Sequence, residues 1–275
     1  MTRGADRLAA ILHQGGDDLH LPLCFLLASV DHVPDLDVDL ALSRYEALQE
    51  GASQRVGGRN SRDEVVRRLN AYFFEELGFR GNDSDYYDER NNFLHEVVNR
   101  RLGIPLTLSV LYRDAVRRVG LPGEGIGLPG HFVVRVGTGD EARYVDPFRG
   151  GDSYDIAECR RRVRATLGRS HLPADIFQPR SDRAILHRGL LNLKMIYARE
   201  QRTESALKVV TRILQVSPGD LAEVRDRGLL RLELGQCWLA VDDMRAYLKG
   251  RRNAPDRMRV RYMMRQALEN ALRLN

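Results

Sequence analysis

Two residues in the middle of the chain have the types and the spacing that acid–base chemistry requires. His131 follows a Pro-Gly turn in the motif PGHF, and Asp146 lies in the motif YVDPF. An imidazole that a carboxylate holds in place can take a proton from a nucleophile, as in enzymes that transfer acyl groups. The same pair can instead be structural, because a histidine bonded to a carboxylate also fixes a strand pair and a tautomer. A nucleophile beside His131 would decide between these interpretations.

A helix and a set of short strands must position these two residues. The segment IPLTLSVLYRDAVRRVG has apolar residues at helical spacing, carries a proline in its first turn and ends at Gly120. After it, short β-branched and aromatic segments predict antiparallel strands. These segments are GEGIGLPG, HFVVRV and ARYVDPF, with the turn GTGDE between the last two. The implied core is a helix packed on a small antiparallel sheet.

Residues 1–80 are predicted to be mainly helical. Apolar residues recur at helical spacing there, and Ser61 and Glu64 have the spacing of a capping box. A polar loop over residues 80–92 follows, and we expect its two tyrosines to anchor it by packing. A short helix after the loop is predicted to end at Gly103.

The C-terminal third returns to helices and repeats itself. Ala206 and Ala240 lie 34 residues apart, which is the period of tetratricopeptide (TPR) repeats. The repeat is degenerate, since Gln201 stands where the second copy has Gly235. A final amphipathic helix, Pro255 to Leu274, is expected to cap the array with a polar outer face.

The sequence therefore predicts an α+β protein of two domains. Residues 1–175 are expected to form the helical N-terminal region and the helix-plus-antiparallel-sheet core. Residues 181–275 are expected to form TPR-like helical hairpins.

The composition indicates a globular protein without a membrane span. The chain has 275 residues, of which 43% are hydrophobic, but no run approaches the roughly 18 apolar residues of a membrane helix. Asp17 and Asp18 stand where a signal peptide needs an apolar stretch, so we expect a cytoplasmic location. Cys24, Cys159 and Cys237 are widely spaced, which predicts buried thiols rather than disulfides or a zinc site.

Positive charge is concentrated in the repeat domain. Residues 181–275 hold 19 Lys+Arg against 11 Asp+Glu. The arginines are scattered along helical faces without interleaved aromatic residues, which disfavours nucleic-acid binding. We expect solvated helix surface there, or a surface that suits an acidic protein partner.

The middle third resembles the transglutaminase-like superfamily, and nearly the whole chain resembles its SirB-type members. The segments that carry the resemblance are YYDERNNFLHEVVNRRLGIPLTLSVLYRDAVRRVGLP, GIGLPGHFVVRV and YVDPFRGG, followed by RGLLNLKMIY in the repeat region. In active members of the superfamily a cysteine opens the helix, a histidine on the next strand activates it, and an aspartate on the following strand orients the histidine. The resemblance places His131 on the base, Asp146 on the orienting residue and Pro105 on the cysteine.

A proline at the nucleophile position implies that ordinary transglutaminase or cysteine-peptidase chemistry is absent. Proline lacks the thiol and also the backbone N–H that a cysteine at a helix N-terminus can contribute to an oxyanion hole. Thr107 and Ser109 lie within about one helical turn of Pro105 and are weak replacement candidates. Cys24 or Cys159 would need a fold that brings them to the imidazole. No cluster of residues has metal-ligand spacing, and no phosphate loop is present, so we expect neither a metal nor a cofactor.

Two functions remain open from the sequence. The first is a noncatalytic protein-interaction or regulatory scaffold, in which a protein or peptide partner binds the TPR-like groove or the former acyl-transfer cleft. The second is an acyl-transfer or hydrolytic enzyme in which His131 and Asp146 activate Thr107, Ser109, a remote cysteine or a water molecule. The missing cysteine favours the first.

Overall fold

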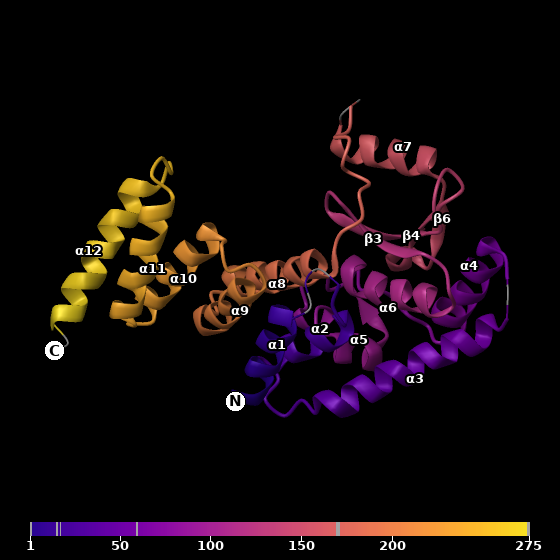
Figure 1. Cartoon of the computed structure of the whole chain (residues 1–275), viewed down its shortest axis with the longest axis horizontal. Helices are drawn as coiled ribbons and strands as arrows, with labels where there is room; N and C mark the ends of the chain where they lie inside the picture. The colour runs from indigo at the N-terminus through magenta and orange to yellow at the C-terminus, as the bar shows by residue number, and fades with distance from the viewer. Residues whose placement is uncertain (1, 15, 17, 59, 169–170, 274–275) are drawn as a thin grey trace. The chain divides into compact units, whose positions relative to one another are not determined.

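The computed structural model describes residues 2–14, 16, 18–58, 60–168 and 171–273 (Figure 1). Asp17 and Leu274, which the sequence predictions used, lie outside the described residues. The chain divides into two compact units, Met1–Gly189 and Leu190–Asn275. Within the described part of the chain, no helix is long and apolar enough to span a membrane.

Helices make up most of the first unit, as the sequence predicts. Those before the sheet are α1 (Thr2–Gln14), α2 (Leu21–Ser29), α3 (Val38–Val56), α4 (Arg62–Asn70), α5 (Leu94–Arg100) and α6 (Pro105–Arg118), with a 3₁₀ turn, η2 (Glu89–Asn91), before α5. The Ser61 hydroxyl accepts a hydrogen bond from the Glu64 backbone N–H at 3.3 Å and so caps α4. The Glu64 carboxylate pairs with Arg67 and Arg68 instead of completing the capping box. Gly120, with a φ of 83°, follows the end of α6 as expected.

A π-helical segment, η1 (Ala71–Glu76), continues α4. The backbone N–H of Leu77 donates to the carbonyl of Tyr72, five residues earlier, at 3.0 Å, so this turn holds one residue more than an α-helical turn. The segment buries Tyr72 and Phe73, and the ring of Phe73 lies edge-on to that of Phe79 at 5.8 Å.

The prediction that α5 ends at Gly103 is wrong. The helix ends earlier, and Arg101 adopts the left-handed conformation, with a φ of 59°, that the glycine was expected to supply. Gly103 lies in β2 (Leu102–Gly103), which pairs in parallel with β1 (Arg80–Gly81). A Cβ atom at Gly103 would lie 2.9 Å from the Thr107 hydroxyl oxygen. The close approach of the first turn of α6 therefore requires the glycine.

The strands after α6 form one antiparallel sheet in the order β3–β4–β5–β6, which confirms the predicted core. They are β3 (Gly123–Leu128), β4 (His131–Val136), β5 (Arg143–Asp146) and β6 (Asp152–Tyr154). Alternation along β4 puts His131 and Arg135 on the same face. Tyr144 lies opposite Arg135, so Asp146, two residues further along β5, projects from that face as well.

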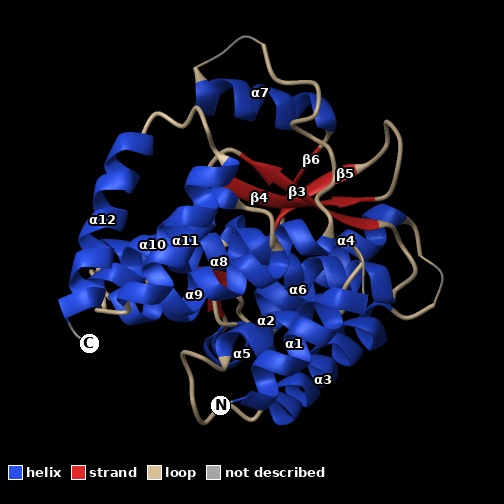
Figure 2. Cartoon of the chain, turned by 60° about the vertical axis from the view of Figure 1, so that its left-hand side comes forward, coloured by secondary structure: helices blue, strands red, loops and turns tan. Residues whose placement is uncertain are grey.

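The sheet lies between α6 and α7 (Ile156–Leu167) (Figures 1 and 2). On the α6 side, the Ser109 hydroxyl donates to the backbone carbonyl of Phe132 at 3.3 Å. The opposite face, which carries His131 and Asp146, forms an apolar cluster with α7. The buried members of this cluster are Ile126, Leu128, Val133, Tyr144, Cys159, Val163 and Ile176.

The last five helices carry the sequence repeat. They are α8 (Asp182–Arg199), α9 (Thr203–Val216), α10 (Leu221–Glu233), α11 (Cys237–Gly250) and α12 (Arg257–Arg273). Gln201, at a φ of 56°, follows the end of α8, and Gly235, at a φ of 73°, follows the end of α10. After α8, the Arg202 N–H donates to the Tyr197 carbonyl at 2.9 Å, and the residues 34 positions later, Gln236 and Arg231, form the same bond at 2.8 Å. Both helices are thus followed by the same Schellman turn, so the repeat is present in the structure as well as in the sequence.

The outer face of α12 is mixed rather than polar as predicted. The helix buries the small residues Ala267 and Ala271, whereas Met258, Tyr262 and Leu272 are 72%, 60% and 64% exposed. Small side chains allow α12 to pack closely on its neighbour, and the larger apolar side chains are left on the surface.

We expect Gln201→Gly to stabilise the second unit by about 0.5 to 1 kcal/mol, because glycine adopts a positive φ without steric cost. Gly235→Gln is the matched control at the equivalent turn and should destabilise the unit. Urea denaturation of the full chain measures both changes. Equal effects of the two substitutions would contradict the equivalence of the two turns.

Candidate functional site

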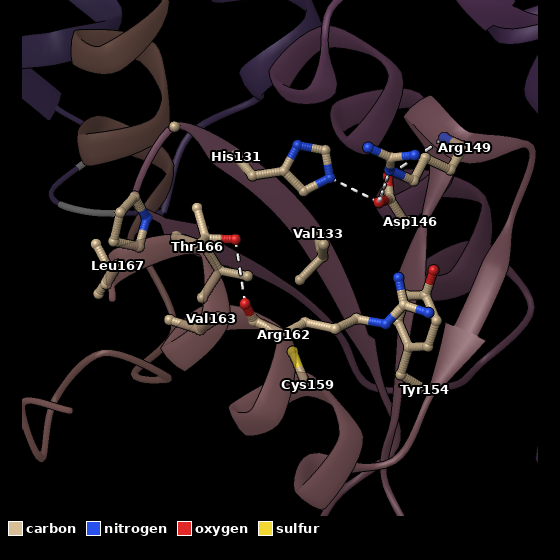
Figure 3. Close-up of a pocket in the computed structure, with 13 residues that line it drawn as sticks. His131, Val133, Asp146, Arg149, Tyr154, Cys159, Arg162, Val163, Thr166 and Leu167 are labelled. Carbon is tan, nitrogen blue, oxygen red and sulfur yellow. Dashed lines mark hydrogen bonds and ion pairs between the residues drawn. The ribbon is translucent and has the colours of Figure 1, made fainter. Parts of the chain in front are cut away.

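His131 and Asp146 form a hydrogen-bonded pair at one end of the sheet (Figure 3). His131 Nε2 lies 2.6 Å from Asp146 Oδ2, and the two side chains are 27% and 4% exposed. Asp146 Oδ1 also accepts the backbone N–H groups of Phe148 and Arg149, at 3.1 and 3.3 Å, and so caps the 3₁₀ turn η3 (Pro147–Arg149). An ionised carboxylate only accepts hydrogen bonds, so beside such a carboxylate the imidazole donates through Nε2, and in the neutral form of the ring Nδ1 carries the lone pair.

The pair borders a cavity of about 410 Å³ between the sheet and α7. His131, Asp146 and Arg149 lie at one end of it, and Val163, Thr166 and Leu167 of α7 lie at the other (Figure 3). The remaining lining residues are Leu128, Pro129, Gly130, Val133, Tyr154, Cys159 and Arg162. Among the described residues that line the cavity, none comes from α6. Its walls are mainly apolar.

Two arginines at the cavity differ in how strongly they are held. The Arg162 guanidinium lies over the Tyr154 ring at 4.1 Å, and its Nε donates to Glu158 at 2.7 Å. Arg149 is 66% exposed, and its Nε is 3.9 Å from Asp146 Oδ2. Arg149 is therefore the cation that can move toward a bound group.

The candidate nucleophiles of α6 are engaged in backbone contacts. Pro105 is buried at the first position of the helix. The Thr107 hydroxyl donates to the Asn91 carbonyl at 2.8 Å and accepts the Ile104 N–H at 3.2 Å, which caps α6. Both Thr107 and Ser109 are at most 1% exposed. The structure brings His131 to Asp146 but places neither hydroxyl in hydrogen-bond contact with the imidazole among the described interactions.

Phe148 fills the space beside the imidazole. Its ring lies edge-on to His131 at 6.1 Å and edge-on to Tyr86 at 6.1 Å. A Cβ atom at Gly81 would lie 2.6 Å from the Phe148 ring, so Phe148 also covers β1. The Tyr86 contact shows how the polar loop is anchored by packing.

The fold brings one cysteine to the cavity, which the sequence could not indicate. Cys159 of α7 lines the same space as His131. Burial, together with the charge of Asp146, raises the pKa of the Cys159 thiol to about 12, which disfavours the reactive thiolate. Cys24 is buried in α2, and burial raises the pKa of its thiol to about 12 as well.

The α7 wall is the part of the site that the sequence analysis missed. Cys159, Val163 and Leu167 recur every four residues, so their helical period could have indicated a buried stripe. That period does not say which face of the sheet the stripe covers. The described residues contain no group of three or more His, Cys, Asp or Glu side chains arranged to hold a metal ion.

Known proteins share both parts of this architecture. Residues 40–191 match the family model of the transglutaminase-like superfamily, and residues 193–267 match that of the tetratricopeptide repeat. A UPF0162 protein of Xylella fastidiosa (strain Temecula1) is 38% identical over 240 residues, which cover 85% of each chain. Protein SirB1 of Salmonella typhimurium is 26% identical over 83% of this chain and 86% of its own. These similarities confirm the SirB-type resemblance.

A eukaryotic protein matches a little over half of the chain. F-box only protein 21 of Homo sapiens is 29% identical over 162 residues, which cover 56% of this chain and 25% of that protein. No solved structure matches the chain.

We expect the Cys159 thiol to be alkylated by iodoacetamide at pH 8 on the order of 100 to 1000 times more slowly in the folded chain than in urea. A raised pKa leaves the thiol protonated until the pH approaches about 12, and the thiolate is the reacting form. Mass spectrometry of the peptide that contains Cys159 measures the rate, and the urea-unfolded chain is the control. Equal rates in the two states would return Cys159 to the candidate nucleophiles.

Proposed function

We propose a noncatalytic, protein-binding role for this chain. The chain belongs to the transglutaminase-like superfamily and to the UPF0162 family. In this role the chain is a protein-interaction or regulatory scaffold, and we propose the cytoplasm as its compartment. The cavity beside His131 binds a peptide segment or side chain, and the TPR-like unit binds a protein partner.

The main support for the proposal comes from the groups that could attack an acyl carbon, and from how each of them is buried and bonded. The position expected to hold the cysteine is Pro105, and the hydroxyls of Thr107 and Ser109 donate to backbone carbonyls in buried positions. Cys159 lines the cavity, but burial keeps its thiol protonated near neutral pH. A base without a nucleophile supplies only one of the two groups that covalent acyl transfer needs.

The same geometry supports binding at the cavity. Its volume of about 410 Å³ and its mainly apolar walls suit a side chain or a short peptide segment. His131 Nδ1 offers a lone pair to a donor such as an amide N–H, and Arg149 offers donors to a carbonyl or carboxylate.

The second unit supports an acidic protein partner. A cavity of about 560 Å³ in this unit is lined in part by Lys249, Arg251 and Arg252 at the end of α11. All three side chains are exposed. Because exposed cations attract an anionic segment over several ångströms, this surface steers such a partner toward the unit.

We expect the chain to show neither glutamine-dependent amine incorporation nor peptide hydrolysis above background, and His131→Ala to leave that background unchanged. Fluorescent-amine incorporation into casein and release of a fluorophore from a peptide library measure the two reactions. Circular dichroism controls for the folding of the variant. Turnover that His131→Ala lowers by about 100-fold or more, the range of a lost general base, would favour the enzyme instead.

A photocrosslinker tests binding at the cavity. We expect p-benzoylphenylalanine at position 166, where Thr166 lines the cavity, to capture a partner in cells of the source organism. The same group in place of Ala165, exposed on α7 but not part of the lining, is the matched control. An adduct at both positions, or at neither, would contradict a bound partner in this cavity.

A further inference from the structure

A second cavity of the first unit has no part in the role proposed above. It measures about 290 Å³ and lies between the start of α3 and α5. Its apolar lining includes Val33, Leu36 and Leu40, and Leu40 is 50% exposed. The other lining residues are Asp35, Asp37, Ala41, Arg44, His95, Glu96, Val98 and Asn99.

A buried histidine in this lining has no hydrogen-bond partner. The His95 side chain is 9% exposed, and neither Nδ1 nor Nε2 is bonded to any described group. The nearest carboxylate oxygen, on Glu96, is 3.7 Å from Nε2. One face of the ring is stacked on Phe93 at 6.0 Å, with an angle of 18° between the planes. A buried donor and acceptor left without partners destabilise a fold, so such a group calls for a ligand or another explanation.

The charge around His95 is mainly negative. Burial lowers the pKa of His95, against the opposing effect of Glu96, so the imidazole is neutral at pH 7. Asp35, Asp37 and Glu96 contribute three carboxylates to the described lining, and Arg44 contributes one exposed guanidinium. Asp37 uses one oxygen to accept the Leu40 N–H at 2.9 Å, where it caps α3. Asp35 and Glu96 are therefore the carboxylates best able to receive a cation.

We propose that this cavity binds the side chain of an arginine from a protein partner. A guanidinium is planar, stacks on aromatic rings and donates to carboxylates through two parallel hydrogen bonds. Its apolar stem suits the surface formed by Leu36 and Leu40. Both nitrogens of the neutral His95 imidazole are buried in this structure, so the ring must turn toward the cavity for its lone pair to accept one further N–H. A metal ion does not fit, because the described lining has no cluster of metal-ligating side chains.

The test uses the full chain and two fluorescent peptides, Ala-Leu-Arg-Leu-Ala and its citrulline counterpart, which has the same shape without the charge. We expect the arginine peptide to bind about tenfold more tightly than the citrulline peptide in fluorescence anisotropy. Asp35→Asn and Glu96→Gln should each weaken binding of the arginine peptide by about tenfold. Asp140→Asn, which removes an exposed carboxylate from the β4–β5 turn, is the matched control and should change nothing.

His95→Phe separates a ligand contact from a structural role. The phenyl ring keeps the stacking on Phe93 and removes both unpartnered nitrogens, so we expect weaker binding of the arginine peptide by a chain that is at least as stable as the parent. Equal affinity for the two peptides, no measurable binding, or the same loss with Asp140→Asn would overturn the proposal. Self-association of the chain that the arginine peptide reverses would overturn the assignment to a partner and point to a second copy. None of these outcomes depends on the cavity beside His131.

Discussion

The burial of the Asp146 carboxylate is the constraint on which the structure of the sheet beside the candidate site depends. A carboxylate that is 4% exposed must find hydrogen-bond partners inside the protein, since an unpaired buried charge costs several kcal/mol. Asp146 takes two backbone N–H groups from η3 and the Nε2–H of His131. Those three bonds determine where the chain turns after β5. Because of this turn, Phe148 packs beside the imidazole. The pairing of β4 with β5 brings the acceptor and its donor to the same face.

The elements around the site could be predicted because their signals are local. The PGHF and YVDPF motifs indicate a turn and two strands, and the 34-residue spacing of Ala206 and Ala240 indicates the helical repeat. The α7 wall of the cavity could not be predicted, because the contact of Val163 with the sheet depends on which face α7 covers. The role of Gly103 could not be predicted from the sequence either. Its need for a small side chain comes from Thr107, four residues further on in α6, whereas the local pattern indicated a helix cap.

The cavities of the two units differ in chemistry. The cavity at the sheet combines apolar walls with a hydrogen-bonded histidine. The cavity at α5 combines carboxylates with a histidine whose imidazole is neutral. The surface at the end of α11 is cationic. In the scaffold role proposed above, these three surfaces would distinguish segments of a partner by charge, because a like-charged segment is repelled where an oppositely charged one is attracted. The positive net charge of the chain therefore says little about any one of its surfaces.

The π-helical turn at η1 has a consequence for how this chain tolerates changes of length. Since that turn already holds one surplus residue, a one-residue deletion within Ala71–Glu76 would leave an ordinary α-helical turn and keep both flanks in register. The same deletion inside α4 would rotate Val65, Val66 and Leu69 by about 100° relative to the residues that follow, and so turn buried side chains toward water. Length variation among related chains should therefore be concentrated at η1 rather than in the regular helix before it.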